Sequence, residues 1–581
     1  MRSGGAKRTR LWRLATARVA KASRAATRPL RLAVGGLLAA TPERLLIAPQ
    51  DIRTCDPTAA TDIYAGVFIF SGQILEAGGR SPFDLVPPSD EWARTLHGFG
   101  WLRHLRAADS MLARSNARAL VDDWIRAADR IPDVAWRPEV AARRLLSWLS
   151  QSPLILEGCD REFYGRFLKA LSRLVRFVRI TYPDLPDGLP RLQGAMALVA
   201  AGASIAGQER LLRTAVRLLD QELARQVLPD GGHVSRNPGV VIELLVDLLP
   251  IRQALSSRGV APSATVMGAV DRMMPMLRFF RLGEGSFVRF NGMSATPRSL
   301  LGTVLTYDDS LGQPALNASH SGYQRLEAID AAVVMDAGPP PPGSVSGTAH
   351  AGCLSFEFGT RRNLVVVNCG AAPPGRTEWY RAARETAAHS TATVENTSSA
   401  RIVAGQGSDV WPGAALLDGP TQVPVHREDG PDLSLVAASH DGYADRHGLV
   451  HERTLALTAS GERLDGVDRF LLTGGGPRPG ADRFVLRFHL HPTAKASRST
   501  GGEAVLIVFP DGEAWRFGAA SGEIGLEESV FLAAPQGPRR TAQITVTGRA
   551  RATPEVAWSF ERQSTGRAPA RRSTPEEPGF L

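Results

Sequence analysis

Asp230-Gly231-Gly232-His233-Val234-Ser235-Arg236-Asn237-Pro238 is the stretch that decides the fold, because it separates two segments with helical spacing. Apolar residues repeat at intervals of three and four over residues 212–227 and again over residues 240–249, which is typical of two amphipathic helices. The paired glycines permit positive φ, and Ser235 or Asn237 can cap the second helix. The stretch therefore predicts a helix-to-helix turn, either a functional loop or a turn and cap alone.

Helical spacing extends on both sides of this turn and predicts an all-α domain over residues 45–311. Its first part is rich in tryptophan, and the members are Trp92, Trp101, Trp124, Trp136 and Trp148. Large aromatic side chains are chiefly buried, so we expect most of these to pack in the core. Stacking of one or two of them on a sugar is the alternative.

Beyond residue 312 the pattern changes from helical spacing to short segments with period two, broken by the proline run at 339–342. The predicted strands lie at 331–335, 354–358, 364–367, 391–394, 484–490 and 504–509. Many short strands with turns between them indicate an antiparallel β-sandwich, which we assign to residues 312–564. The polar segment 565–581 is predicted to be a disordered tail.

Length and charge agree with a chain of two main domains. A chain of 581 residues exceeds what one hydrophobic core serves, and no apolar run reaches the roughly 18 residues of a membrane span. Ten basic residues precede the first acidic residue, Glu43, so the net charge of +10 belongs to an arm over residues 1–44. This arm suits peripheral contact with an anionic membrane. No nucleic-acid motif follows, and we expect no nucleic-acid partner.

The cysteines and the first residues give little information about the fold or the function. Four cysteines without C-x-x-C spacing are too few for a disulfide framework, and Cys353 and Cys369 are expected to be buried thiols. An apolar stretch at residues 32–40 follows the basic segment. It reads either as a cleaved leader or as part of an amphipathic arm, and the long basic part favours the arm.

Polar residues gather at the predicted strand ends of the β domain. His350 and Asn368 each adjoin an apolar strand, and His389 follows a segment that begins at Trp379. Two imidazoles and an amide oxygen are donors that a divalent metal accepts. The alternative is that these residues are satisfied by local hydrogen bonds.

Taken in order, these motifs resemble the heparinase II/III family of polysaccharide lyases. The motifs are D-G-G-H-x-x-R-x-P from Asp230, H-A-x-x-L-S-F-E from His350, V-N-x-G from Val367 and W-x-x-x-x-R-x-T-x-A-H-x-T from Trp379, within a match over residues 92–492. The resemblance implies a multidomain α+β chain, with an incomplete (α/α) toroid joined to an antiparallel β-sandwich. It also implies an acidic polysaccharide in the groove between them. By the same resemblance we expect the cell envelope or periplasm as location, with the cytoplasm as alternative.

The family reaction that this resemblance implies is β-elimination. An Asn or His neutralises the uronate carboxylate, and a Tyr/His pair moves the C5 proton and protonates the leaving O4, with fixed donors stabilising the developing charge. This chain departs from that pattern at three positions. Leu189 stands where the Asn is expected, Val240 where the Tyr is expected and Thr348 where the first His of the H-x-H motif is expected.

The retained polar residues give the candidate site. We expect His233 and Tyr380 to serve as base and acid, with a substrate-binding groove formed by Arg236, Asn237, Arg191, Arg381 and Arg384. The alternative for the arginines is a solvated face. The resemblance also implies a structural divalent metal, zinc or calcium, at His350, Asn368 and His389, where the amide replaces a carboxylate.

Three functions follow as hypotheses. The first is a lyase that acts on an acidic, uronate-containing envelope or capsular polysaccharide. The second is a catalytically degenerate glycan-binding or assembly protein with the same fold. The third is a sugar hydrolase with Asp230 and Glu357 as its two carboxylates. The sequence leaves the oligomeric state open.

Overall fold

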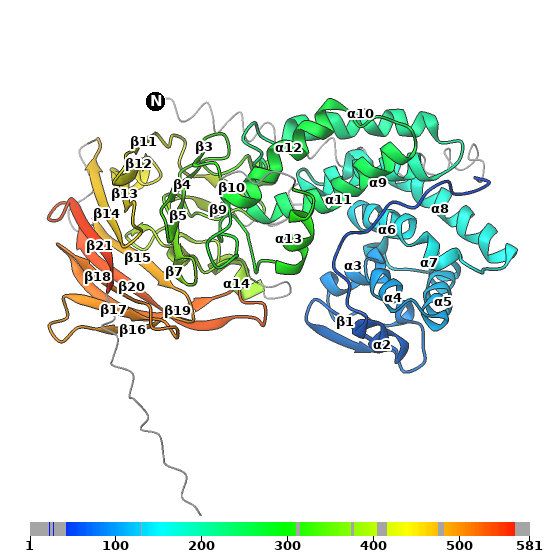
Figure 1. Ribbon diagram of the computed structural model, residues 1–581, viewed down its shortest axis with the longest axis horizontal. Helices are drawn as coiled ribbons and strands as arrows, with labels where there is room; N and C mark the ends of the chain where they lie inside the picture. Colours follow the sequence, from blue (N-terminus) through cyan, green and yellow to red (C-terminus); the bar gives the residue numbers. More distant parts are fainter. Residues whose placement is uncertain are drawn as a thin grey trace, which may run out of the picture.

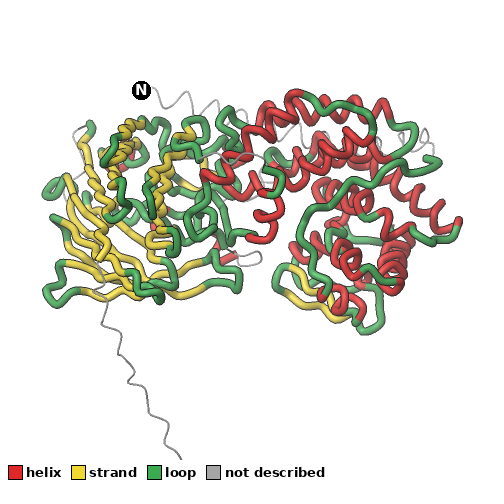
Figure 2. Tube along the Cα trace, in the orientation of Figure 1, coloured by secondary structure: helices red, strands yellow, loops and turns green. Residues whose placement is uncertain are grey.

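The computed structural model describes residues 23, 27, 42–128, 130–308, 314–372, 377–403, 415–474 and 481–563. Within these residues the chain forms a helical lobe followed by a β lobe (Figure 1). Figure 2 shows most helices in the first lobe and most strands in the second, with one small hairpin, residues 67–76, in the helical lobe. Most of the predicted arm 1–44, the boundary at 311/312 and the tail 565–581 lie outside the described residues. The predicted fold class, an (α/α) toroid followed by an antiparallel β-sandwich, is confirmed.

Helices over residues 58–305 build the toroid, with a small hairpin between the first two. The helices are α2 (Thr58–Tyr64), α3 (Asp90–Gly98), α4 (Leu102–Ala108), α5 (Met111–Ala127), α6 (Pro138–Ser150), α7 (Ser152–Leu156), α8 (Arg161–Thr181), α9 (Leu189–Ser204), α10 (Glu209–Gln226), α11 (Pro238–Ser257), α12 (Ala264–Phe279) and α13 (Arg298–Leu305). The hairpin is β1 (Val67–Phe70) with β2 (Gln73–Glu76). Short 3-10 turns lie at η1 (Pro82–Asp84), η2 (Asp133–Trp136) and η3 (Tyr182–Asp184).

The start of the helical domain differs from the sequence prediction. Residues 42–57, here called the amino-terminal strap, contain no helix and cross the helical lobe before α2, as the dark blue trace in Figure 1 shows. Leu45 forms an antiparallel bridge with Ile205, and the Leu46 N–H donates to the Ser204 carbonyl at 2.7 Å. The strap and the β1–β2 hairpin were both predicted as helix, and both are extended instead.

Two antiparallel sheets pack face to face in the β lobe. One has the order β11-β12-β13-β14-β21-β18-β17-β16, and the other β19-β20-β15-β7-β6-β5-β4-β3, with β8 pairing β15. Their bounds are β3 (Asn317–Ala318), β4 (Tyr323–Glu327), β5 (Ala331–Asp336), β6 (Phe356–Thr360), β7 (Leu364–Val367), β8 (Ala392–Val394), β11 (Val425–Asp429), β12 (Leu433–His440), β13 (Leu449–Thr458), β14 (Arg463–Leu472), β15 (Arg483–Leu490), β16 (Lys495–Arg498), β17 (Ala504–Val508), β18 (Ala514–Ala519), β19 (Glu523–Phe531), β20 (Arg539–Arg549) and β21 (Glu555–Gln563). A separate pair joins β9 (Arg401–Val403) to β10 (Ala415–Asp418), and short helical segments are η4 (Gly343–Val345), α14 (Thr377–Ala382), η5 (Thr386–Ala388) and α15 (Ala444–His447). All six predicted strands are present, and the one predicted at 354–358 begins two residues later.

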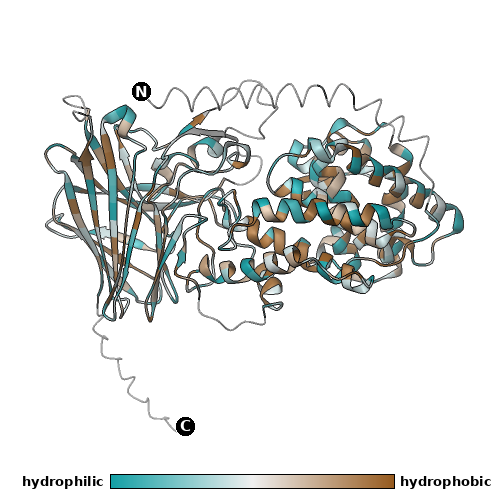
Figure 3. Ribbon diagram, turned by 90° about the horizontal axis from the view of Figure 1, so that it is seen from above, coloured by the Kyte–Doolittle hydropathy of each residue, from teal (hydrophilic) through white to brown (hydrophobic). Residues whose placement is uncertain are grey.

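The core of the helical lobe continues across the junction to Tyr323, Ala332 and Val334, and a second core fills the sandwich. Figure 3 colours inward faces of the helices brown, as hydrophobic. Trp92 and Trp148 are fully buried, and Trp124 packs edge to face on Trp148 at 5.4 Å. The predicted packing role of the tryptophans is thereby confirmed for these three. No disulfide joins the four cysteines, and Cys353 and Cys369 are buried as predicted. Among the described residues, no helix is long and apolar enough to cross a membrane.

The sandwich core also encloses a charged cluster. Both oxygens of Asp468 accept hydrogen bonds from Arg453, at 2.9 and 3.0 Å, and one of them also bonds His451 Nε2 at 2.6 Å. The indole N–H of Trp558 donates to the second oxygen at 2.8 Å. Burial alone raises the pKa of the Asp468 carboxyl, but Arg453 and His451 hold it below its ordinary value. The carboxylate is therefore ionised inside the core.

Candidate functional site at the junction of the two domains

The turn at residues 230–238 joins α10 to α11, as the sequence predicts, and it lies where the helical lobe meets the β lobe. Gly231 has φ +88°, and a Cβ there would lie 1.9 Å from the Arg272 carbonyl oxygen, so no other residue fits. Asp230 accepts hydrogen bonds from the backbone N–H and the hydroxyl of Ser321 at 2.7 and 3.0 Å. The turn is thus bonded to the start of the β lobe.

His233 was predicted to be a catalytic base, and the structure places it inside the turn. Its ring is 2% exposed, with Nδ1 at 2.7 Å from the Ser235 hydroxyl and Nε2 at 2.9 Å from the Gln226 amide oxygen. Burial lowers the pKa of His233 to about 3. With both ring nitrogens bonded and water excluded, the geometry supports a structural role for this imidazole and offers no nitrogen to a substrate.

This burial predicts a pH dependence of stability. Because the pKa of His233 is lowered to about 3 in the folded protein, the unfolded chain binds the additional proton as the pH falls from about 6.5 toward 3. His233 therefore contributes a loss of stability on acidification with a slope of up to about 1.4 kcal/mol per pH unit. Denaturant titrations at several pH values are expected to show a shallower slope for His233→Gln. The exposed His426 gives the matched control, His426→Gln, and an equal slope in wild type and His233→Gln would contradict the prediction.

Arg236 was predicted to bind substrate, and the structure uses all of its donors within the protein. Its guanidinium donates to the carbonyls of Ser321, Gly322, Gly338 and Pro339 at 2.7–3.0 Å and forms an ion pair with the Asp336 carboxylate. The residue is 7% exposed. Every bond runs from the helical lobe to the β lobe, so Arg236 acts as a brace between the domains.

Asn237 caps α11 as the sequence predicts, since its side-chain oxygen accepts from the Gly239 N–H at 2.9 Å. The same junction is closed from the β side. The Tyr323 hydroxyl donates to the Arg236 carbonyl and accepts from the Asn291 amide at 2.8 Å. The polar residues of the turn therefore build a satisfied network that leaves few groups for a ligand.

The remaining predicted residues are divided between the two lobes. Arg191, on α9, donates to the Leu185 carbonyl at 2.7 Å. Arg384 is 1% exposed and donates to the carbonyls of Ala349 and Ser346 at 2.7 and 3.0 Å. Arg381 is exposed, and Tyr380 is 37% exposed with its hydroxyl bonded to the Gly347 carbonyl. The structure brings Tyr380 and Arg384 together, 5.3 Å from guanidinium to ring, whereas the ring nitrogens of His233 bond to Ser235 and Gln226.

The three predicted metal ligands lie in the β lobe. His350 Nδ1 and His389 Nε2 face one another at 3.0 Å. Asn368 is fully buried, and its oxygen already accepts from the Ser390 N–H at 2.9 Å while its amide nitrogen has no partner. Across the described residues no group of three His, Cys, Asp or Glu side chains is placed to hold a metal ion. The predicted donor set of two imidazoles and an amide contains no anionic ligand for a divalent metal.

The three positions at which the sequence departs from the pattern that the resemblance implies lie in α9, in α11 and in the loop after η4. Leu189 begins α9 directly after Gly188, whose Cβ position is 3.4 Å from Val345 of η4. Val240 lies in the first turn of α11, and the Thr348 carbonyl approaches the Cβ position of Gly292 at 2.7 Å. Apolar and hydroxyl side chains thus stand where the resemblance expects an amide, a phenol and an imidazole.

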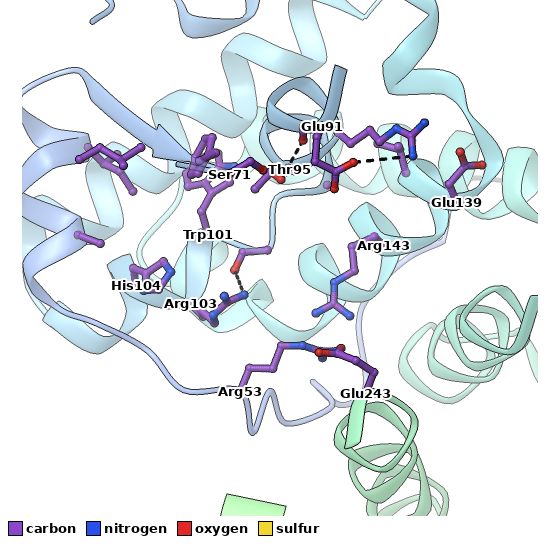
Figure 4. A pocket seen from close by; sticks show the side chains of 18 of the residues that line it. Arg53, Ser71, Glu91, Thr95, Trp101, Arg103, His104, Glu139, Arg143 and Glu243 are labelled. Carbon is purple, nitrogen blue, oxygen red and sulfur yellow. Dashed lines mark hydrogen bonds and ion pairs between the residues drawn. The ribbon is translucent and has the colours of Figure 1, made fainter. Parts of the chain in front are cut away.

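A pocket of about 740 Å³ opens in the toroid, and the sequence analysis missed it. Figure 4 shows Arg53, Arg103 and Arg143 pointing toward the same part of this toroid pocket, with Glu91 and Glu139 on another side. Its charged lining residues are Arg53, Arg94, Arg103, Arg143, Asp62, Glu91, Glu139 and Glu243. Equal numbers of cationic and anionic side chains give this pocket little net charge.

Asp247 of α11 is buried and bonds to three side chains that line the toroid pocket. It pairs with Arg53 of the strap, and Arg143 and Gln193 donate to it at 3.1 and 3.2 Å. Burial raises its pKa, but Arg53 and Arg143 hold the pKa of Asp247 below the ordinary value. The Asp247 carboxylate therefore joins the amino-terminal strap to α6, α9 and α11.

The comparisons with known proteins agree with this architecture. The model of the domain "Heparinase II/III-like, C-terminal" matches residues 311–559. The solved structure of heparinase III superposes with a TM-score of 0.67 at 14% identity, covering 90% of this chain and 87% of that chain. A heparan sulfate lyase HepC mutant from Pedobacter heparinus gives a TM-score of 0.61 at 16% identity, covering 88% and 84%. At such identities these structures show the fold alone.

A curated relative is much more similar in sequence. FtsZ-localized protein C of Caulobacter vibrioides is 34% identical over 486 residues, which is 82% of each chain. The similarity covers both lobes, and the matched domain model supplies the family. The chain therefore belongs to the heparinase II/III-like family.

Proposed function

We propose that this chain is a non-catalytic member of the family that works as an assembly protein together with FtsZ. The observation that carries the proposal is the use of the polar turn at residues 230–238. His233 is bonded on both ring nitrogens, and Arg236 spends its donors on the junction between the lobes. Positions 189, 240 and 348 carry Leu, Val and Thr, so uronate elimination lacks its usual groups among the described residues.

Two further observations support this proposal. The relative of 34% identity carries a name that places it with FtsZ rather than with a polysaccharide. The toroid pocket is lined by four arginines and four carboxylates, whereas a long polyanionic glycan is attracted by a surface of net positive potential. Both favour assembly over degradation.

A second candidate function is β-elimination on an acidic envelope or capsular polysaccharide. One observation favours it: the Tyr380 phenol is partly exposed, and the guanidinium of Arg384 lies 5.3 Å from its ring. A phenol beside a cation is a suitable proton-transfer group. In this candidate Arg381 and Asn237 would contact the glycan.

Localisation and turnover measurements distinguish the two. We expect a fluorescent fusion of the full chain to coincide with FtsZ in dividing cells and the purified protein to sediment with FtsZ polymers. We expect no rise in ultraviolet absorbance on a panel of uronate polysaccharides, with an active heparinase III as positive control. Diffuse fluorescence without co-sedimentation would contradict the assembly proposal. An unsaturated product would establish β-elimination, the second candidate function.

A further inference from the structure

We propose that a hydrogen bond between His350 and His389 takes the structural place of the divalent metal in this chain, and that no metal binds there. The family resemblance leads to the expectation of a metal at His350, Asn368 and His389. The contacts of these three side chains point to a different arrangement. The inference concerns the β lobe and is independent of the proposed function.

The protonation of the imidazole pair, His350 and His389, follows from its contacts. His389 Nδ1 lies 2.8 Å from the Glu385 carbonyl oxygen. A carbonyl only accepts, so this nitrogen carries the proton and His389 Nε2 presents its lone pair. His350 Nδ1, 3.0 Å away, must then be the donor. In the metal-free pair the lone pair of His389 Nε2 therefore accepts the His350 N–H, and a metal would have to displace this hydrogen bond to bind both nitrogens.

The third position is also unsuited to a cation. The oxygen of Asn368 is fixed by the Ser390 N–H, and the buried group without a partner is the amide nitrogen, which is a donor. The Asn368 oxygen could thus give a metal only one neutral lone pair beside the Ser390 N–H, where a carboxylate would give a second, anionic oxygen.

A positive charge lies beside the pair. Arg384 donates to the carbonyl of Ala349, the residue before His350, at 2.7 Å. With two neutral imidazoles and an amide, the site has no anionic ligand to offset a divalent cation next to a guanidinium. Coulomb repulsion in a buried site is poorly screened.

The hydrogen bond between His350 and His389 links two segments of the β lobe. His350 follows the loop after η4, and His389 follows η5, so their hydrogen bond ties two segments that are 39 residues apart. Gly352 permits this approach, because a Cβ at that position would lie 2.8 Å from Cδ2 of His389. The rings meet edge to face with centroids 5.0 Å apart.

The test is the zinc content of the full chain after equilibrium dialysis against zinc, with the unfolding temperature measured in zinc and in chelator. We expect wild type to hold well below one zinc per chain and to unfold at the same temperature in both. Asn368→Asp keeps an oxygen for the Ser390 N–H and adds a free anionic oxygen, so we expect it to bind one zinc per chain and to unfold at a higher temperature in zinc.

Two controls separate this site from surface binding. Asn317→Asp adds the same charge on β3, where the Asn317 oxygen accepts from Gln324, and is expected to behave as wild type. Adding His389→Ala to Asn368→Asp is expected to abolish the gained zinc. Stoichiometric zinc in wild type that His389→Ala removes would overturn the proposal, and that measurement does not depend on the folding of Asn368→Asp. A folded Asn368→Asp without zinc would also overturn it.

Discussion

Replacing Arg236 by methionine is expected to lower the free energy of unfolding by about 3–5 kcal/mol, the usual cost of breaking one side of a buried ion pair. The change leaves the Asp336 carboxylate buried with only the Asn291 amide and the Gly338 N–H as donors. It also leaves four carbonyls of the β lobe without their guanidinium donor. Because these bonds couple the two lobes, we expect calorimetry to show one joined unfolding transition in wild type and two resolved transitions in Arg236→Met.

Arg381→Met provides the matched control for this prediction. The side chain of Arg381 is 71% exposed and lies 3.8 Å from Glu385, so its replacement should change stability by less than about 0.5 kcal/mol. A loss below about 1 kcal/mol for Arg236→Met, with the transitions still joined, would show that the brace does not hold the lobes together.

The second large effect is expected in the sandwich core, from Asp468→Asn. The substitution removes the charge that Arg453 and His451 face and turns an acceptor oxygen into a donor that confronts other donors. A buried guanidinium without its partner costs about 3–5 kcal/mol, and we expect this loss in urea titrations at pH 7.

The pH dependence of stability provides an independent test of the prediction for Asp468→Asn. Since the pKa of Asp468 is held below its ordinary value in the folded protein, its contribution is present above about pH 4 and is lost as the pH falls further. Asp468→Asn should therefore lose less stability than wild type below pH 4. Asp465→Asn on the same strand removes a partly exposed pair with Arg463 at 2.8 Å and should be nearly neutral. A variant at position 468 as stable as that control would contradict the prediction.

Local features of the site followed well from the sequence. The turn between α10 and α11 and its Asn237 cap depend on contacts between residues near in sequence. Periodicity and turn chemistry report such contacts directly. The hairpin β1–β2 was missed although Ser71 and Gly72 between two apolar segments give the signal of a two-residue turn.

The roles of the polar side chains could not be predicted from the sequence in the same way. From the sequence, Arg236 was predicted to bind substrate. Its acceptor is the carbonyl of Gly338, about a hundred residues later in the chain, and the sequence does not reveal this contact. Arg53 and Asp247 are 194 residues apart and share no motif. A charged residue looks alike in sequence whether it faces a ligand or a distant backbone carbonyl, and only the fold decides between them.

The amino-terminal strap determines how the molecule carries tension. A pull applied at Pro42 is transmitted to α9 through the Leu46–Ser204 hydrogen bond and to α11 through the ion pair of Arg53 with Asp247. These attachments lie ahead of α2, whereas Arg236, just before the first residue of α11, joins the helical lobe to the β lobe. Force that enters at the strap therefore reaches α9 and α11 of the helical lobe before it can pass to the β lobe through the bonds of Arg236.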